Sequence, residues 1–510
     1  MTGDVWVVLA PALLGSGAFA IYLVARLLTS RNDLLALLTA LVFAAALVAL
    51  VPLQFTTGVG HLPAWGRFGP GGAFLRADPG ALVVAGVALG LGLLVALYSG
   101  CYLALDRRYE DYYPLLLLLV AGLVGMVMAA DLFNLYMFCE LMSAAAYVLV
   151  AFRRHTDTAI EAGFKYLVMG SVGTVTILLG ISFVYRETGT LALSQATSAP
   201  GPWTRAGLAC FLVGLGIKSA IVPLHTWLPD AHGRAPSSIS AMLSGIIVQS
   251  VFYALLKVCL GLGWAGRDLG ALLIVLSLFN MTLGNGLALV QTNTKRLLGY
   301  STIAQMGYIM LSVGVGLRYD VPVAIQAGFF LLLAHAAMKG LAFLCKGVCH
   351  FYCDATTINQ LRGTATRLPL VAVAFSVALA GLAGMPPLAG FAAKWFILMG
   401  TLRSADGLGY VGLAAFLLNS LLSLGYCLPL IGTLFTRKTS QDFGETSASS
   451  DFGELSQGVS EASEVSIQIS PWMVVPIVAL GALVLAIGLY PGPWLGWTAN
   501  AGVYLLALGR

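Results

Sequence analysis

The sequence predicts an all-α, polytopic membrane protein of about 14 transmembrane helices, on three observations. Of its 510 residues, 59% are hydrophobic and only 10% are charged, whereas a soluble domain carries roughly 25% charged residues. The mean hydropathy, +0.90, is correspondingly high. Apolar runs of ~20 residues, each long enough to cross a hydrocarbon core as a helix, recur along the whole chain. A water-soluble fold is therefore excluded.

The predicted spans follow one another with mostly short connections. The first has no basic leading region, because Met1–Leu9 contains only Asp4 as a charge. It is also too long for a signal sequence, so we expect it to be retained. By the criterion of ~20 residues per crossing, the spans lie at 5–27, 33–53, 81–105, 114–130, 131–152, 161–185, 206–228, 236–261, 270–292, 295–317, 322–346, 368–400, 410–436 and 472–490.

Two of these spans are predicted to be broken. The seventh contains Gly214–Pro223 around Lys218, and the twelfth contains Gly384–Lys394 with two adjacent prolines. Proline removes a backbone hydrogen bond, which hydrocarbon tolerates only where protein or water satisfies the freed carbonyl. Broken helices at corresponding positions are typical of inverted repeats with an ion site near the midplane, so we predict two inverted five-helix repeats, helices 4–8 and 9–13. The segments are N-terminal helices at 1–113, half-channels at 114–261 and 270–436, an acidic cytoplasmic loop at 437–470, and a C-terminal helix and tail at 471–510.

The distribution of basic residues predicts the orientation. Loops after odd-numbered spans hold about twice as many Lys and Arg residues as loops after even-numbered spans. Loops rich in Lys and Arg face the cytoplasm, so we expect a multi-pass protein of a bacterial or archaeal inner membrane with both termini outside. The loop 437–470 repeats Asp-Phe-Gly-Glu at 442–445 and 451–454. A variable linker explains this loop better than a contact with a neighbouring subunit.

Charged residues inside the spans are few, and nearly all are lysines. Each costs roughly 2.5 to 3.5 kcal/mol at the centre of a membrane helix, so such residues mark a functional path. Burial disfavours the charged form of lysine, which can then exchange a proton, whereas arginine stays charged. Among the acids we expect only Glu140 to be clearly internal, with Asp131 near a helix start, and we predict that Glu140 pairs with Lys218. The internal lysines are predicted to be Lys165, Lys218, Lys257, Lys339 and Lys394. Because Lys165 and Lys257 lie near span ends, extension to the interface stays open for both.

Two histidines extend the predicted path. His225 and His335 can carry protons near neutral pH or serve as neutral, hydrogen-bonded core residues. His335 and Lys339 are four residues apart, so they lie on one face of the eleventh helix. A chain of hydroxyl and amide groups would lead from there to Lys394 through Ser301, Thr302 and Gln305.

The eight cysteines imply neither a disulfide framework nor a metal site. Most lie in apolar spans, where a free thiol behaves as a small hydrophobe. Cys345, Cys349 and Cys353 lie near His350 at four-residue spacing and would line one face of a helix. Because this spacing differs from known cysteine metal sites, we predict no metal here.

Several ordered motifs carry a family resemblance. They are Asp131-Leu132-Phe133-Asn134, Cys139-Glu140-Leu141-Met142-Ser143, Ile217-Lys218-Ser219, Pro223-Leu224-His225-Thr226-Trp227-Leu228-Pro229-Asp230-Ala231-His232, Ala235-Pro236-Ser237-Ser238-Ile239-Ser240-Ala241, Lys295-Arg296-Leu297-Leu298-Gly299-Tyr300-Ser301 and the segment 386–394. Over residues 80–436 or so, the chain resembles the antiporter-like subunits shared by respiratory complex I, membrane-bound hydrogenases and Mrp-type Na⁺/H⁺ antiporters.

The resemblance implies roles for individual residues. Glu140 would be the acid of the fifth helix, Lys218 and Lys394 the lysines of the two broken helices, and His335 and Lys339 the central connection. One position departs from the pattern. Many relatives have a lysine in the eighth helix four residues before a tyrosine, and here Gln249 precedes Tyr253. Glutamine cannot carry the proton, so either another residue connects the half-channels or this subunit conducts less completely.

The resemblance further implies a proton-translocating subunit that couples redox chemistry in partner subunits to transport, rather than a catalytic chain. A subunit of an Mrp-type antiporter and a non-conducting structural subunit are the alternatives. No strand-led glycine-rich loop or ferredoxin-type cysteine spacing is present, so we expect no cofactor in this chain; iron–sulfur clusters, flavin or quinone would belong to partner subunits. Expected partners are sister and other membrane subunits, lipid, protons and in one alternative Na⁺, but no nucleic acid. The predicted proton path comprises Glu140, Lys218, His225, Gln249, Lys257, His335, Lys339 and Lys394.

Overall fold

The computed structural model describes residues 2–27, 32–56, 62–66, 74–104, 106, 108–153, 156–193, 200–404, 406–437 and 467–509. Most of the loop predicted at 437–470, including its Asp-Phe-Gly-Glu repeat, lies outside these residues. The all-α prediction is confirmed, since the described chain consists of helices and one two-stranded hairpin.

The elements follow in chain order. The first half of the chain forms α1 (Thr2–Leu27), α2 (Asn32–Thr56), β1 (Ala64–Trp65), β2 (Leu75–Arg76), α3 (Pro79–Tyr102), α4 (Tyr109–Met128), α5 (Leu132–Val150), α6 (Asp157–Thr188), α7 (Pro202–Lys218), α8 (Trp227–Arg234), α9 (Ser237–Met242), η2 (Leu243–Ile247) and α10 (Val248–Gly261). The second half forms α11 (Gly266–Leu289), α12 (Thr294–Tyr319), α13 (Pro322–Cys353), η3 (Asn359–Leu361), α14 (Thr364–Arg367), α15 (Pro369–Ala383), α16 (Ala389–Thr401), α17 (Gly407–Phe435), α18 (Pro471–Leu489) and α19 (Gly492–Gly509).

Helix length and composition place the chain in a membrane. In the described ranges, 11 helical segments are long and apolar enough to cross one, and they cover predicted spans 1–6, 8, 9, 11, 13 and 14. Helix α12 lies at the tenth predicted span, and the seventh and twelfth are interrupted, as α7/α8 and α15/α16. Where the sequence predicts a tail, α19 adds a helix of 18 residues. The count of 14 crossings and the five-helix repeats stay predictions.

The first predicted break is confirmed. Helix α7 ends at Lys218, and the chain becomes helical again only at Trp227. The backbone N–H of Val222 donates to Asn280 Oδ1 at 2.9 Å, and the Trp227 indole N–H donates to the Ile217 carbonyl at 2.7 Å. Backbone groups freed by the break thus find partners inside the protein, as a low-dielectric interior requires.

The second break is also confirmed, and a lysine caps it. Helix α15 ends at Ala383, and α16 begins at Ala389. Gly384 adopts a φ of +88°, in the left-handed region that glycine enters without steric cost. The Lys394 ammonium donates to the Ala383 carbonyl at 2.9 Å. A Cβ at Gly384 would lie 2.7 Å from Lys394 Cδ, so a side chain at this position would force the lysine to shift.

A segment of π-helix interrupts the eighth span. It comprises Leu243–Ile247 and lies between α9 and α10. Such π-segments are rare and recur at functional sites. This one ends two residues before Gln249, so it sets the direction in which that side chain points.

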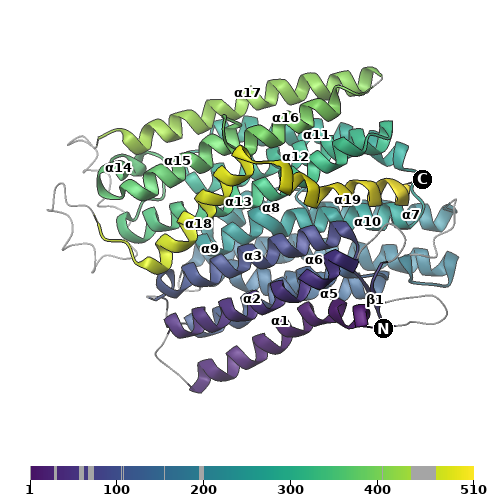
Figure 1. Cartoon of the computed structure of the whole chain (residues 1–510), viewed down its shortest axis with the longest axis horizontal. Helices are drawn as coiled ribbons and strands as arrows, with labels where there is room; N and C mark the ends of the chain where they lie inside the picture. The colour runs from purple at the N-terminus through teal and green to yellow at the C-terminus, as the bar shows by residue number, and fades with distance from the viewer. Residues whose placement is uncertain are drawn as a thin grey trace.

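Figure 1 shows the long helices side by side, with both chain termini at the same end of the bundle and α14 at the opposite end. The most apolar windows of α13 and of α9–α10 are 100% buried, whereas those of α6 and α17 are only 33% buried. Helices α10 and α13 therefore form the centre of the bundle. The apolar outer faces of α6 and α17 suit lipid or another membrane subunit.

Candidate functional site

A lysine–carboxylate pair lies at the first helix break. The Lys218 ammonium is 3.2 Å from Glu140 Oε1 and donates to Ser143 Oγ at 2.7 Å. The Tyr147 hydroxyl is 3.5 Å from the same nitrogen, and Thr174 donates to Glu140 Oε1 at 2.6 Å. Lys218 is 4% exposed. The structure thus brings together the two residues that the sequence predicts to pair.

Local structure explains this geometry. Asp131 caps the start of α5 by accepting from the Asn134 N–H at 2.8 Å, which fixes where the helix begins. Glu140, Ser143 and Tyr147 then recur at three- and four-residue spacing, so they lie on one face of α5. Glu140 keeps 33% of its side chain exposed. The pair thus joins a buried ammonium to a carboxylate that is only partly buried.

The centre of the bundle contains a second polar group. Gln249 on α10 lies 2.6 Å, Nε2 to Nδ1, from His335 on α13, and both residues are buried. One turn further along α13, Lys339 donates to the Leu298 carbonyl at 2.6 Å and to Ser301. His335 and Lys339 thus share one face of α13, as predicted.

Lys394 lies at the second break. Besides capping Ala383, it donates to Ser423 Oγ at 3.2 Å, and its ammonium lies 5.2 Å from the centroid of the Tyr308 ring. Gln305 donates to the Leu382 carbonyl at 3.1 Å, next to the same helix end. Lys394 is 8% exposed. Hydroxyl and amide groups on α12 thus lie between the central group and this lysine.

Several buried polar atoms along this line have no hydrogen-bond partner among the described residues. They are Gln249 Oε1, His335 Nε2, Gln305 Oε1 and both ring nitrogens of His232. Nearly all buried polar groups in proteins are paired with protein or with ordered water. A buried water molecule can satisfy such an atom where the site is polar and roomy enough. The central polar groups are therefore chemically able to take part in proton transfer.

His225 lies in the break between α7 and α8. It is partly exposed, and its Nδ1 atom has no hydrogen-bond partner among the described residues. The structure gives no contact between His225 and Lys218, so His225 stays a predicted member of the path.

Three lysines near helix ends differ from the predicted internal set. Lys165, for which the sequence leaves extension to the interface open, has 50% of its side chain exposed and pairs with Glu161 at 2.7 Å. Lys295 and Lys346 stand at the ends of predicted spans and were not counted as internal, but they are 7% and 1% exposed. Each donates to a backbone carbonyl, of Ala235 and Ala355 respectively. The error has one cause, since burial near a helix end depends on which neighbours cover it.

The prediction that Glu140 is the only clearly internal acid is also wrong. Asp78 is completely buried and lies 2.9 Å from the Lys257 ammonium. Lys257 is 4% exposed, so it does not extend to the interface. Asp78 stands just before a predicted span, so its sequence position alone suggests a residue at the membrane interface. The signal that could have located it is the Asp-Pro pair, which is typical of a helix cap followed by the first helical residue.

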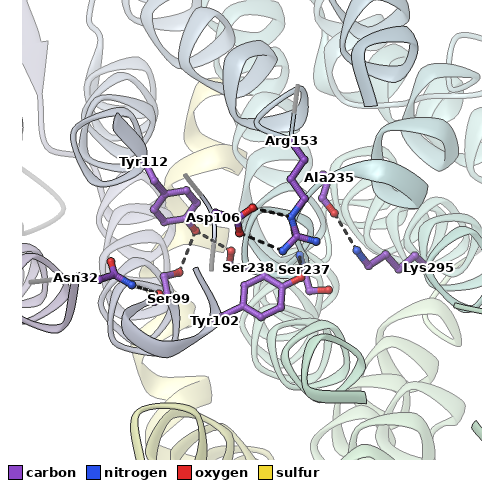
Figure 2. A network of polar contacts seen from close by, with 10 residues as sticks. All are labelled: Asn32, Ser99, Tyr102, Asp106, Tyr112, Arg153, Ala235, Ser237, Ser238 and Lys295. Atoms are coloured by element: carbon purple, nitrogen blue, oxygen red, sulfur yellow. Dashed lines mark hydrogen bonds and ion pairs between the residues drawn. The ribbon is translucent and has the colours of Figure 1, made fainter. Parts of the chain in front are cut away.

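Figure 2 shows a polar network near the end of α3 and the start of α9. Arg153 and Asp106 form an ion pair at 3.2 Å, and the Tyr102 hydroxyl accepts from the Ser237 backbone N–H at 3.2 Å. The other members are Asn32, Ser99, Tyr112, Ser238, Ala235 and Lys295. These contacts join α2, α3 and α4 to the start of α9. The serines of the Ala235–Ala241 motif therefore hold helices together.

The cysteines at the end of α13 are free thiols. Among the described residues, no group of three or more His, Cys, Asp or Glu side chains is arranged to hold a metal ion.

Comparison with known proteins identifies the family. Residues 129–423 match the family described as "NADH:quinone oxidoreductase/Mrp antiporter, TM". The chain belongs to this family. The match contains both helix breaks and the residues from Glu140 to Lys394. The resemblance stated from the motifs is thereby confirmed.

A relative and two solved structures refine this result. NADH-quinone oxidoreductase subunit N of Desulforudis audaxviator is 32% identical over 433 residues, covering 82% of this chain and 83% of that protein. A chain of the membrane-bound sulfane sulfur reductase, an archaeal respiratory membrane complex, has a TM-score of 0.83 at 26% identity, with 98% of each chain covered. A chain of the Mrp complex from Dietzia sp. DQ12-45-1b also has a TM-score of 0.83, at 25% identity, covering 98% of this chain and 100% of that one. The fold thus fits respiratory and antiporter complexes equally well.

Proposed function

We propose that this chain moves protons through the membrane as one subunit of a larger, redox-driven complex. The observation that carries the proposal is a series of ionisable groups from the first helix break to the second. It runs from the buried Lys218 with the partly exposed Glu140, through the buried His335 and Lys339, to the buried Lys394. These groups come from four helices, α5, α7, α13 and α16, and a charge costs free energy to bury. Such a series is typical of a proton path.

The chemistry follows from the contacts. A carboxylate close to a lysine favours its charged form, so a change in the Glu140–Lys218 distance shifts the affinity of Lys218 for its proton. Among the described residues, the Lys339 and Lys394 ammonium groups donate hydrogen bonds to carbonyl and hydroxyl oxygens, so either can release a proton without leaving a buried carboxylate unpaired. We infer that the proton passes along this series and that His225 and Lys257 extend it toward the surfaces.

The coupling partner and the surrounding assembly belong to the same proposal. The sequence relative is a subunit of a redox complex, which favours redox coupling over the Mrp-type alternative, whereas the fold alone favours neither. Iron–sulfur clusters, flavin or quinone would then lie in partner subunits. We further propose that both termini face outside and that helices 4–8 and 9–13 form two inverted half-channels.

Isolation of the assembly tests this function. We expect the complex purified from native membranes to contain subunits with flavin or iron–sulfur absorption, and its inverted vesicles to take up protons when an electron donor is oxidised. Purification of membrane subunits alone, with Na⁺-dependent proton exchange and no redox cofactor, would contradict redox coupling and establish the antiporter alternative.

Gln249 offers a separate test, because it occupies the place of a lysine in many relatives. We expect Gln249→Lys to raise donor-driven proton uptake at least about twofold, since a positioned acid–base group accelerates the transfer that it serves. Gln249→Leu should lower uptake, because it leaves His335 Nδ1 without its partner. Gln326→Lys, at a partly buried glutamine elsewhere on α13, is the control and should change nothing. Equal effects at both positions would show that the added charge acts nonspecifically.

A further inference from the structure

We propose that Asp78, Tyr253 and Lys257 form a proton-release station between the centre of the bundle and the end at which α3 begins. This inference rests on the proposed function and adds to it a route from the central group to one membrane surface.

The three side chains form one compact, buried cluster. Asp78 Oδ1 accepts from the Ala81 N–H at 2.8 Å and from the Tyr253 hydroxyl, and Asp78 Oδ2 lies 2.9 Å from the Lys257 ammonium. Lys257 also donates to the Val127 carbonyl at 3.0 Å. Exposure is 0% for Asp78, 1% for Tyr253 and 4% for Lys257. A carboxylate, a phenol and an ammonium are thus in direct contact and shielded from solvent.

The cluster is connected to the central group along α10. Gln249, Tyr253 and Lys257 recur every four residues, so they lie on one face of that helix, with about 6 Å of rise between successive members. The first member contacts His335 on α13. The Tyr253 ring also packs edge-on against Phe329 of α13, with the two ring centroids 5.8 Å apart. One face of α10 therefore leads from His335 to the buried ion pair.

The other side of the cluster faces one end of the bundle. Asp78 caps the start of α3 and follows β2 by two residues. Strand β2 pairs with β1, which Figure 1 places beside the N-terminus. Arg76, in β2, is only partly buried. The buried carboxylate thus lies only two residues from a partly exposed side chain.

Stability alone does not explain such a cluster. Desolvation offsets most of the attraction in a buried ion pair, and apolar residues of similar volume are often as stable or more stable. A proton-transfer role explains all three groups. A proton arriving from the His335 side binds the Tyr253 oxygen as the Tyr253 hydroxyl proton passes to the Asp78 carboxylate, so the phenol stays neutral. Asp78 then passes the proton on toward the surface and returns to its ion pair with the Lys257 ammonium, 2.9 Å away.

Tyr253→Phe is the decisive variant, because it removes the hydroxyl and keeps both the packed ring and the Asp78–Lys257 pair. We expect protons taken up per donor oxidised, measured in inverted vesicles, to fall at least about twofold, since loss of a positioned proton donor slows its step by roughly 10²-fold or more. Tyr98→Phe is the control. Tyr98 is a buried tyrosine whose hydroxyl donates to the Leu344 carbonyl at 3.0 Å, and its loss should leave the ratio unchanged.

A second variant tests the ion pair itself. Asp78→Asn combined with Lys257→Gln removes both buried charges together, so neither is left unpaired, and it should lower the ratio as Tyr253→Phe does. An unchanged ratio in Tyr253→Phe would reduce the cluster to a structural clamp and overturn the release station. If Lys218→Met lowers the ratio in the same assay, the proposed function stands while this inference falls. An unchanged ratio in Lys218→Met as well would overturn both.

Discussion

Replacing Lys218 by methionine should abolish most donor-driven proton uptake by the complex while leaving its assembly intact. Methionine fills a similar volume and adapts its shape, so α7 should still end at the break. The ammonium that contacts Glu140, Ser143 and Tyr147 would be gone. Loss of a positioned proton-transfer group costs on the order of 10²-fold or more, so we expect uptake in inverted vesicles to fall at least about tenfold.

Lys165→Met is the matched control for that substitution. Lys165 is a lysine on the adjacent helix α6, but half of its side chain is exposed, and it pairs with Glu161. An exposed pair of this kind contributes little, so proton uptake and assembly should both stay near their original values. Normal uptake in Lys218→Met would contradict the role of Lys218 and favour a non-conducting subunit. Equal losses in both variants would point to a general effect of removing positive charge.

Lys339→Met is the second substitution with a large expected effect. Lys339 is completely buried at the centre of the bundle, where it donates to the Leu298 carbonyl and to Ser301. Its loss removes the ionisable group between His335 and the second break. We expect proton uptake in vesicles to fall at least about tenfold, by the same argument from proton-transfer rates.

Lys346→Met provides a demanding control, because Lys346 is also buried and lies on the same helix, α13, but donates to the Ala355 carbonyl at the helix end. We expect it to lower the thermal stability of the complex while leaving the number of protons per donor unchanged. Equal losses of protons per donor in Lys346→Met and Lys339→Met would contradict a specific role of Lys339. The loss would then come from removing any buried lysine of α13, through an effect on folding. If Lys339→Met left it unchanged, the path could not run through the centre of the bundle.

The contacts at the first helix break were largely predictable. Lys218 lies five residues before a proline in an apolar span, and Glu140 lies in the middle of another. A charge so far from a span end has no route to water, so the side chain requires an internal partner. The structure provides that partner at 3.2 Å. The contact of Gln249 with His335 was not predictable, because sequence spacing gives no information on which helices lie side by side.

Charges near helix ends were the main source of error. Lys165 and Lys257 both lie near the ends of predicted spans, yet one is half exposed and the other is buried against Asp78. The difference arises from neighbours: α3 and α4 cover Lys257, whereas no helix of the described chain covers Lys165 to the same extent. Lys295 and Lys346 are likewise buried by contacts between segments distant in sequence.

The sequence by itself determined that the chain is a helical membrane protein, where its two long spans break, and which family it belongs to. Those features follow from local chemistry, because apolar run length, proline and charge act within a single helix. Only the tertiary structure decided which ionisable groups are buried and which of them touch. Burial and contact depend on how separate helices pack, and therefore Asp78, with Tyr253 and Lys257 around it, became visible only in the folded chain.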